Sequence, residues 1–412
     1  MYNNVPPTSG AFLVLKDNKM SALYNTYARS NLNFTHGEGM RLFSDEGTSY
    51  LDFYSGIGVN ALGHNDKALV SALKDSAEKV WHVSNLFQIE SQEKLAKRLV
   101  DLTFADAVFF TNSGTEAIEC AIKTARHYYY TKDEKSRTDI ITFKGAFHGR
   151  TLGAIAAGGN PAYLEGFGEP LAGFVQVETG DIELVEKAID EKTCAILIEP
   201  VQGEGGVNAM SDEFIRSLRE LCDKHDLLLI LDEVQCGYGR TGKLFAYQSA
   251  NIEPDIMAIA KGIGAGFPLG ACLAKEQVAA SMLPGTHGST YGGNPLACTI
   301  GNVVLDRISE PDFLPHVERM GQKLNWHLQQ LAQKFPQYIK EIRGKGLMVG
   351  VKITPPVAEF VALLRKNHLL AIGAGDNVLR LLPPLIVSEQ DIQEAIDIIS
   401  ASFENLKGNE NE

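Results

Sequence analysis

Short apolar runs separated by polar stretches recur through the middle of the chain. Runs of this kind, bounded by glycines or polar residues, predict buried strands. They lie at 107–111, 140–143, 194–198, 227–231, 256–260 and 269–274. Between some of them lie helical patterns, such as the one in which Ser211 caps apolar positions Phe214, Leu218 and Leu221. This alternation predicts an α/β unit with a mostly parallel central sheet, which binds ligands at the carboxyl ends of its strands.

The two ends of the chain have a different pattern. Residues up to about 66 show short strand patterns and many turn residues, whereas long amphipathic stretches follow residue 300, at 313–335 and 357–367. We therefore expect a large domain at 67–300 and a smaller α+β domain formed by 301–412 with the N-terminal segment 20–66. Residues 1–19 are expected to be a leader or an added extension, with Met20 as a candidate natural start.

Composition and charge narrow the class of protein. The 412 residues carry a formal net charge of -13, which argues against nucleic acid or an anionic membrane as the main partner. There is no apolar run of membrane-spanning length, and the first residues lack the pattern of a secretory signal. The six cysteines form no C-x-x-C pair, so we expect reduced core thiols in a cytoplasmic protein.

Thr111 to Ala117 join a predicted strand to a predicted helix through Gly114. The first amides of a helix lack internal partners and attract anions, and the hydroxyls of Ser113 and Thr115 would complete a phosphate site. A simple helix cap is the alternative. Farther on, Phe147 and Arg150 follow another predicted strand, and they suit ring stacking and a carboxylate grip respectively.

Asp232 follows a buried strand, where a carboxylate needs a cationic or donor partner. A pyridinium N–H is such a partner, and an anionic Asp keeps the ring protonated as an electron sink. The rival is a Mg²⁺-binding Asp, but that needs a phosphate-binding loop that the sequence lacks, so no metal site is expected. Lys261 follows the next strand, either as a surface residue or as a functional amine. The glycines at 262–266 do not have dinucleotide-loop spacing.

These blocks, together with the small polar loop 287–295, resemble the class III (ω-amino acid) aminotransferases from about Tyr24 onward. Lys261 lies 29 residues after Asp232, as the family pattern requires. The resemblance implies the type I fold of pyridoxal-phosphate (PLP) enzymes, with a large, mostly parallel sheet domain and a smaller α+β domain from the chain ends. Stretches 56–64, 81–85 and 199–206 are most similar to the branch that acts on N2-acetyl-L-ornithine. Ser55 departs from the pattern, which commonly has glycine there.

The resemblance also implies roles for individual residues. Lys261 would hold the cofactor as a Schiff base and move the proton, Asp232 would pair with the ring nitrogen, and Gln235 would contact the phenolic oxygen. Phe147 would stack on the ring. The remaining cofactor contacts would come from Ser113, Gly114, Thr115, His148, Glu233, Val234 and, across a homodimer interface, Thr290.

The implied reaction uses two substrates with different spacing between amine and α-carboxylate. Arg150 would hold the α-carboxylate of acetylornithine, and Arg380 that of glutamate, the product formed from 2-oxoglutarate. Glu204 would cover Arg380 and withdraw when glutamate binds, because the glycines around it would let it move. Ser289 would reach the substrate of the neighbouring subunit.

Two other functions stay open at this point. One is an ω-aminotransferase with succinylornithine, ornithine, N-acetyl-lysine or 4-aminobutyrate as donor. The other is a PLP-binding protein without turnover.

Overall fold

The computed structural model describes residues 22–409, so the expected leader and Met20 lie outside the described residues. The backbone divides into two units, residues 1–33 and 34–412. The described part of the first unit, residues 22–33, consists of bends and irregular backbone, and the Arg29 guanidinium lies 5.4 Å from the Tyr27 ring centroid. All helices and strands described below belong to the second unit.

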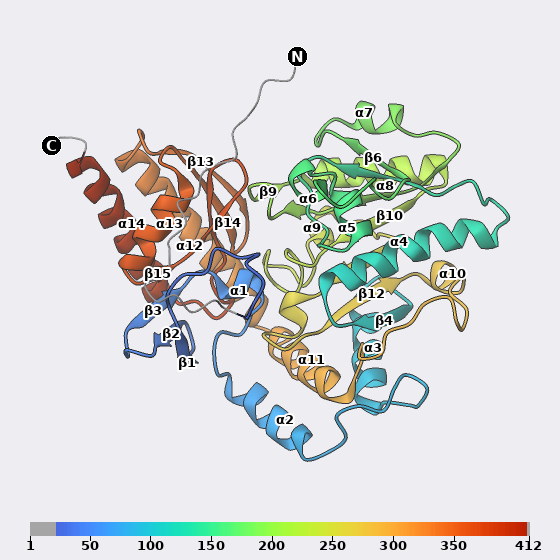
Figure 1. Cartoon of the computed structure of the whole chain (residues 1–412), viewed down its shortest axis with the longest axis horizontal. Helices are drawn as coiled ribbons and strands as arrows, with labels where there is room; N and C mark the ends of the chain where they lie inside the picture. The colour runs from blue at the N-terminus through green and yellow to red at the C-terminus, as the bar shows by residue number, and fades with distance from the viewer. Residues whose placement is uncertain (1–21, 410–412) are drawn as a thin grey trace. The chain divides into compact units, whose positions relative to one another are not determined.

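The largest sheet of this unit has seven strands (Figure 1). Its strand order is β4 (Ala107–Thr111), β12 (Gly270–Ala274), β11 (Ile256–Ile259), β10 (Leu228–Asp232), β7 (Thr193–Ile198), β5 (Asp139–Phe143) and β6 (Phe174–Val177). β12 is antiparallel to both of its neighbours, β4 and β11, and all the other pairs of neighbouring strands are parallel. The mostly parallel sheet predicted from the sequence is therefore confirmed, and all six predicted strands lie in it.

Helices cover both faces of this sheet, because successive strand residues point to opposite sides. On one face, Ile230 and Leu197 pack with α4 (Gly114–Thr131); on the other, Leu229 and Ile196 pack with α8 (Asp212–His225). Ser211 caps α8 as predicted, accepting a hydrogen bond from the amide of Phe214 at 3.0 Å. The other helical segments between residues 55 and 308 are α1 (Ser55–Gly58), α2 (Lys67–Ala77), α3 (Glu90–Leu102), α5 (Leu152–Gly158), α6 (Pro161–Leu164), α7 (Ile182–Lys187), α9 (Tyr247–Ala250), η1 (Lys261–Ile263), α10 (Glu276–Ala279) and α11 (Pro295–Ile308).

The chain ends form two smaller sheets. β13 (Ile339–Lys345), β14 (Met348–Ile353), β17 (Val378–Leu381) and β16 (Ile372–Ala374) make an antiparallel sheet beside α12 (Phe313–Lys334), α13 (Val357–Lys366) and α14 (Glu389–Asn409). The other sheet joins β1 (Phe34–Glu38), β2 (Arg41–Ser44) and β3 (Ser49–Asp52) to β15 (Leu369–Leu370), so N-terminal and C-terminal segments pair directly. A short hairpin joins β8 (Val201–Gln202) and β9 (Asn208–Ala209).

The domain boundaries expected at residues 66 and 300 remain a prediction, since residues 34–412 form one compact unit. Within residues 22–409, every helix is too short or too polar to cross a membrane.

Candidate functional site

Ionisable side chains gather at the carboxyl edge of the seven-stranded sheet. Asp232 ends β10, and Lys261 comes two residues after the last residue of β11, the parallel neighbour of β10. Glu199 directly follows β7, on the other side of β10. Parallel strands end at a common edge, so three acidic or basic groups from separate segments meet there.

A cavity of about 430 Å³ lies at this edge. The predicted site residues that line it are Ser113, Gly114, Thr115, Phe147, His148, Arg150, Glu204, Asp232, Val234, Gln235 and Lys261. Glu233, Ser289, Thr290 and Arg380 are not among its lining residues. Most of the predicted set is thus brought together around one cavity.

The N-terminus of α4 forms one wall of the cavity and requires small residues. A Cβ on Gly114 would lie 2.7 Å from Cγ1 of Val234, and one on Gly149, whose φ is +127°, would lie 2.2 Å from Oγ1 of Thr115. Ser113 caps α4, with its hydroxyl accepting from the amide of Glu116 at 3.4 Å. The start of α4 can therefore be capped by Ser113 and still bind an anion, because the positive end of the helix dipole lies at the cavity.

Asp232 belongs to a buried polar network. Its Oδ2 lies 2.8 Å from Nδ1 of His148, and its Oδ1 accepts from the amide of Val234 at 3.0 Å. Burial disfavours a charged imidazole, but the hydrogen bond and charge of Asp232 outweigh it and raise the pKa of His148. The contact with His148 holds the Asp232 carboxylate in place, and this carboxylate lines the cavity, where it can accept a hydrogen bond from a ligand.

Glu199 also lines the cavity. Its carboxylate accepts from the amide of Phe147 at 2.8 Å and from the amide of Gly203 at 3.3 Å. Burial, together with the charge of Asp232, raises the pKa of Glu199 to about 7. Glu199 thus joins the segment that carries Phe147 to the loop that carries Glu204.

Lys261 has the properties of a functional amine. Burial and the charge of Arg380 lower its pKa to about 8, which increases the fraction of neutral, nucleophilic amine. Its backbone φ is +50°, in the left-handed region that costs a non-glycine residue free energy. Such strain is common at active sites, where the surrounding structure holds it in place.

Arg380 lies on β17 and is fully buried. Its Nη1 contacts Oε1 of Glu204 at 2.7 Å and Oε1 of Gln235 at 3.0 Å. Its Nε and Nη2 are buried and have no hydrogen-bond partner among the described residues. A buried guanidinium with unused donors is costly, and a carboxylate from a ligand would satisfy it.

Arg150 is exposed where it lines the cavity. Its guanidinium stacks 3.8 Å from the ring centroid of Tyr163, a residue of α6, and lies 5.6 Å from that of Phe147. This cation–π contact fixes the plane of the guanidinium and leaves it a side for a carboxylate.

Three of the predicted site residues lie outside the cavity of their own chain, and two of them, Ser289 and Thr290, are expected to act across a dimer interface. Glu233 is buried behind the site, and its carboxylate accepts from the amides of Ala246 and Tyr247 at 2.7 and 2.8 Å. It stabilises the start of α9, because those amides begin that helix. The hydroxyl of Ser289 is used locally, accepting from the amide of Gly292 at 2.9 Å, and Thr290 is exposed outside the cavity.

Several residues that line or support the cavity were not predicted from the sequence. Glu199 ends a buried strand in the same way as Asp232, so the same reasoning applied to that strand would have identified it. Asn112 and Tyr163 gave no such signal, since Asn112 is uncharged and Tyr163 lies in α6 rather than at the end of a strand. Ser55 has φ +50° and donates a hydrogen bond to the carbonyl of Leu382 at 2.5 Å, which joins its turn to the end of β17.

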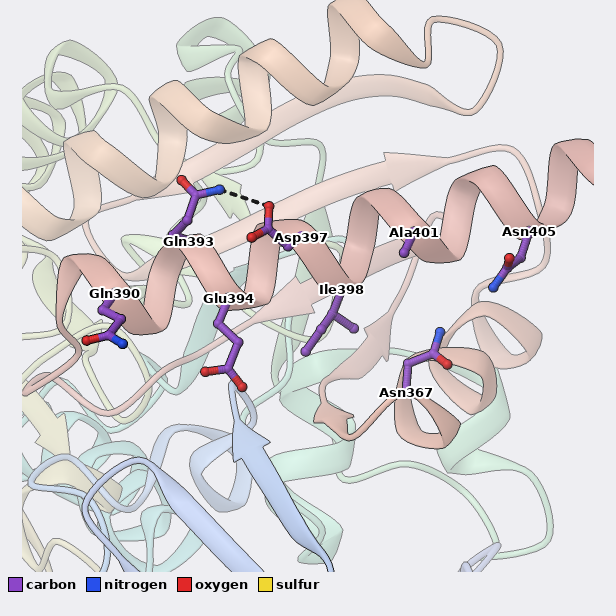
Figure 2. Close-up of a pocket in the computed structure, with 8 residues that line it drawn as sticks. All are labelled: Asn367, Gln390, Gln393, Glu394, Asp397, Ile398, Ala401 and Asn405. Carbon is purple, nitrogen blue, oxygen red and sulfur yellow. Dashed lines mark hydrogen bonds between the residues drawn. The ribbon is translucent and has the colours of Figure 1, made fainter.

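A second hollow, of about 460 Å³, runs along α14 (Figure 2). Its lining residues are Asn367, Gln390, Gln393, Glu394, Asp397, Ile398, Ala401 and Asn405. This set includes no amine, thiol or guanidinium, so the cavity around Lys261 remains the candidate active site.

Comparisons with known proteins agree with this geometry. The family model described as aminotransferase class III matches residues 24–403. An acetylornithine aminotransferase from Mesorhizobium japonicum is 56% identical over 94% of this chain and 97% of its own, and one from Agrobacterium fabrum is 54% identical over 93% and 96%.

Solved structures show the same relationship. The ornithine aminotransferase from Toxoplasma gondii superposes with a TM-score of 0.91 at 30% identity and 94% coverage of both chains. The N-acetylornithine aminotransferase from Stenotrophomonas maltophilia gives 0.82 at 34% identity, covering 93% of this chain and 98% of its own. The chain therefore belongs to the class III aminotransferases, which are PLP-dependent enzymes.

Proposed function

We propose that this enzyme transfers the terminal amino group of N2-acetyl-L-ornithine to 2-oxoglutarate, giving N-acetyl-L-glutamate 5-semialdehyde and L-glutamate. Relatives with more than half of their residues identical carry the name of that activity. The observation that carries the proposal is the Glu204–Arg380 pair in a site that also presents Arg150. Arg150 is open to a ligand carboxylate, whereas Arg380 is covered by Glu204. Two substrates with different spacing between amine and carboxylate require such an arrangement.

The residues of the cavity fit PLP. The N-terminus of α4 suits the phosphate, Lys261 provides an amine, and Asp232 provides a carboxylate for a ring N–H. The cradle has space only because positions 114 and 149 are glycines. When bound, the cofactor supplies the electron sink that the side chains lack.

The protein's own groups supply orientation and proton transfer. With its lowered pKa, Nζ of Lys261 would take a proton from the amine-bearing carbon of the substrate and would return it two atoms away, on the far side of the nitrogen, in a 1,3-shift. Arg150 holds the α-carboxylate of the acetylated donor, while Glu204 keeps Arg380 from gripping the wrong end. With a dicarboxylate in the site, the side chain of Glu204 withdraws and Arg380 takes the second carboxylate.

A donor panel tests the proposal. Initial rates are compared at matched concentrations for N2-acetylornithine, succinylornithine, ornithine, N-acetyl-lysine and 4-aminobutyrate, with 2-oxoglutarate as acceptor. The proposal expects acetylornithine to have the highest kcat/KM. Preference for ornithine would overturn it, and failure to convert the cofactor to its amine form with any donor would indicate a binding protein without turnover.

We also infer a homodimer with shared sites, in which Ser289 and Thr290 complete the partner's cavity. An exposed apolar surface adjoins that loop, since Trp81, Leu86 and Tyr291 are 61%, 89% and 62% exposed, and such surfaces usually mark interfaces. Asn85 ties the two segments together through hydrogen bonds to the carbonyls of Ser289 and Gly292.

Subunit mixing tests the shared site. Lys261→Ala and Thr290→Ala subunits are each expected to be inactive or impaired alone, and mixing should restore one complete site per heterodimer. No recovery in a verified heterodimer would contradict sharing.

A cytoplasmic location is part of the proposal. All six cysteines lie in the described region as buried free thiols, which suits a reducing compartment.

A further inference from the structure

The backbone around Glu204 is packed against three other segments. A Cβ on Gly203 would lie 2.2 Å from Oε1 of Gln235, and one on Gly205 would lie 2.4 Å from the carbonyl oxygen of Gly145. One on Gly206, whose φ is +116°, would lie 2.9 Å from the carbonyl oxygen of Gly375. The glycines thus permit close packing of the backbone, so a movement of the Glu204 carboxylate would come from its side chain rather than from the loop.

The turn between β16 and β17, residues 375–377, is the contact that links this loop to Arg380. The amide of Gly375 donates a hydrogen bond to the carbonyl of Glu204 at 2.8 Å. Three residues beyond the turn, Arg380 lies on β17 and pairs with the Glu204 side chain. The turn therefore sets the position of both partners of the ion pair.

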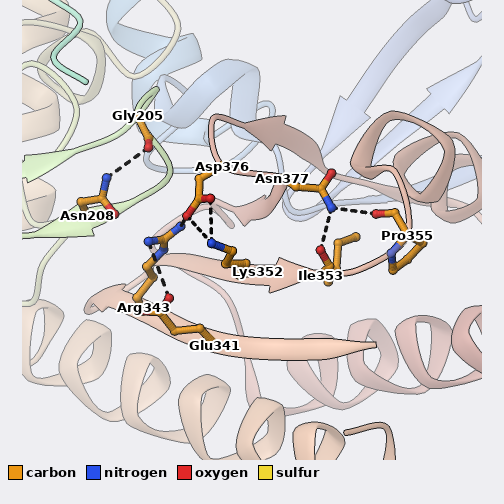
Figure 3. A network of polar contacts seen from close by, with 9 residues as sticks. All are labelled: Gly205, Asn208, Glu341, Arg343, Lys352, Ile353, Pro355, Asp376 and Asn377. Atoms are coloured by element: carbon orange, nitrogen blue, oxygen red, sulfur yellow. Dashed lines mark hydrogen bonds and ion pairs between the residues drawn. The ribbon is translucent and has the colours of Figure 1, made fainter. Parts of the chain in front are cut away.

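Side chains of the turn hold it in an unfavourable conformation. Asp376 and Asn377 have φ values of +58° and +56°. Nδ2 of the Asn377 side chain donates hydrogen bonds to the backbone carbonyls of Ile353 and Pro355 at 2.6 and 2.9 Å (Figure 3). The Asp376 carboxylate accepts hydrogen bonds from Nη2 of Arg343 at 2.6 Å and from Nζ of Lys352 at 2.7 Å.

The ion pairs of Asp376 fix the position of the turn and add little to the free energy of unfolding. The side chains of Asp376 and Lys352 are 43% and 37% exposed, and exposed pairs add little to the free energy of unfolding. The same Arg343 guanidinium, however, packs on the loop: its Nη2 lies 3.1 Å from where a Cβ of Gly206 would be. Asp376 thus connects the turn, Arg343 and the Glu204 loop.

We propose that Asp376 is a positioning residue for substrate selection. By anchoring the turn to Arg343 and Lys352, it holds the Glu204 backbone in register with Arg380, so that the covered state is favoured and opens only by rotation of the Glu204 side chain. This inference rests on the proposed role of Glu204 in covering Arg380.

The test uses the holoenzyme with glutarate, a dicarboxylate that carries no amine and cannot react. Asp376→Asn keeps the shape and tolerates positive φ but removes the charge. We expect glutarate to bind roughly 1.5- to fivefold more tightly, the range that loss of an exposed pair allows. The preference for acetylornithine over glutamate should fall by the same factor while kcat stays unchanged. The control, Glu404→Gln, removes an exposed 2.6 Å pair with Lys334 elsewhere in the fold.

Two further measurements exclude a merely structural effect. Amide hydrogen exchange of residues 203–207 and 375–378, without substrate, should be faster in Asp376→Asn than in Glu404→Gln. Lys352→Gln should reproduce the effect, and the double variant should add less than the sum, because both changes break one interaction.

Unchanged glutarate affinity and exchange in Asp376→Asn would overturn the inference. If Glu204→Ala tightens glutarate binding while Asp376→Asn does not, only the role of Asp376 fails. If neither variant changes glutarate binding, the proposed covering of Arg380 fails as well.

Discussion

Replacing Glu204 by alanine should make the enzyme bind dicarboxylates more tightly. In the free enzyme, Oε1 of Glu204 contacts the buried Arg380 guanidinium at 2.7 Å, and a second carboxylate must displace it. A hydrogen bond to a charged group contributes about 1.5–3 kcal/mol, and the variant no longer spends that free energy when the ligand binds. At about 1.4 kcal/mol per tenfold, glutarate should bind roughly 10- to 150-fold more tightly.

Without a bound ligand, the Glu204→Ala variant should be less stable than the wild type. Without Glu204, Arg380 keeps only the Gln235 contact at 3.0 Å, so the folded state retains a poorly paired buried charge. Breaking a fully buried pair costs about 3–5 kcal/mol, and entry of water into the cavity reduces that cost. The unliganded variant should therefore unfold at a lower temperature, and glutarate should restore more stability to it than to the wild type.

Calorimetric titration of glutarate into both holoenzymes measures the affinity, and single-turnover spectra give the two half-reactions. Glu178→Gln is a matched control, because it removes an exposed carboxylate paired with Lys144 at 2.6 Å. Equal glutarate affinity in wild type and Glu204→Ala would refute the reasoning, as would an unchanged preference for the terminal amine over glutamate.

The remaining predictions concern the ionisable groups of the cavity. Lys261→Ala should lose at least about 10²–10⁴-fold in rate and the visible absorbance of covalently held cofactor, and a variant that keeps both would exclude the assigned role. Covalent capture of PLP by the cofactor-free wild type should speed up as pH rises and level off above about 8, since the neutral amine reacts; a flat profile would contradict the lowered pKa. Glu199 has a raised folded pKa of about 7, so the stability it contributes is full below its unfolded value, about 4.3, and is lost as pH rises through 7. As pH rises from about 4.3 to 7, the denaturation midpoint should therefore fall less for Glu199→Gln than for the wild type. Parallel plots of midpoint against pH would argue against a neutral buried Glu199.

The central sheet was predictable because its strands are buried on both faces and leave continuous apolar runs in the sequence. β6 was missed because Phe174–Val177 lies at the sheet edge and is only partly buried, so glutamine interrupts its apolar run. Asp232 and Lys261 were identifiable for a related reason. An ionisable residue directly after a buried strand is costly unless it has a partner, and that cost is visible in one dimension.

The rest of the site depends on contacts that local sequence does not encode. The stacking of Arg150 on Tyr163 requires α6 to fold back over the segment after β5. The place of Glu233 behind the cavity depends on α9, whose first amides it accepts, and nothing beside Asp232 in the sequence distinguishes the two acids. The hydrogen bond that holds the Glu204 backbone comes from Gly375, in a turn near the other end of the chain.

Substrate selection and proton transfer share one electrostatic balance in this cavity. Burial and the positive charge of Arg380 lower the pKa of Lys261, and the negative charges of Glu204 and Asp232 oppose this shift. If Glu204 withdrew without a replacement, Lys261 would face an uncompensated guanidinium and become a weaker base. A dicarboxylate brings its own negative charge to Arg380 as Glu204 departs, so the amine keeps nearly the same proton affinity with either substrate. A site that exchanges one carboxylate for another can therefore change its substrate while keeping its base unchanged.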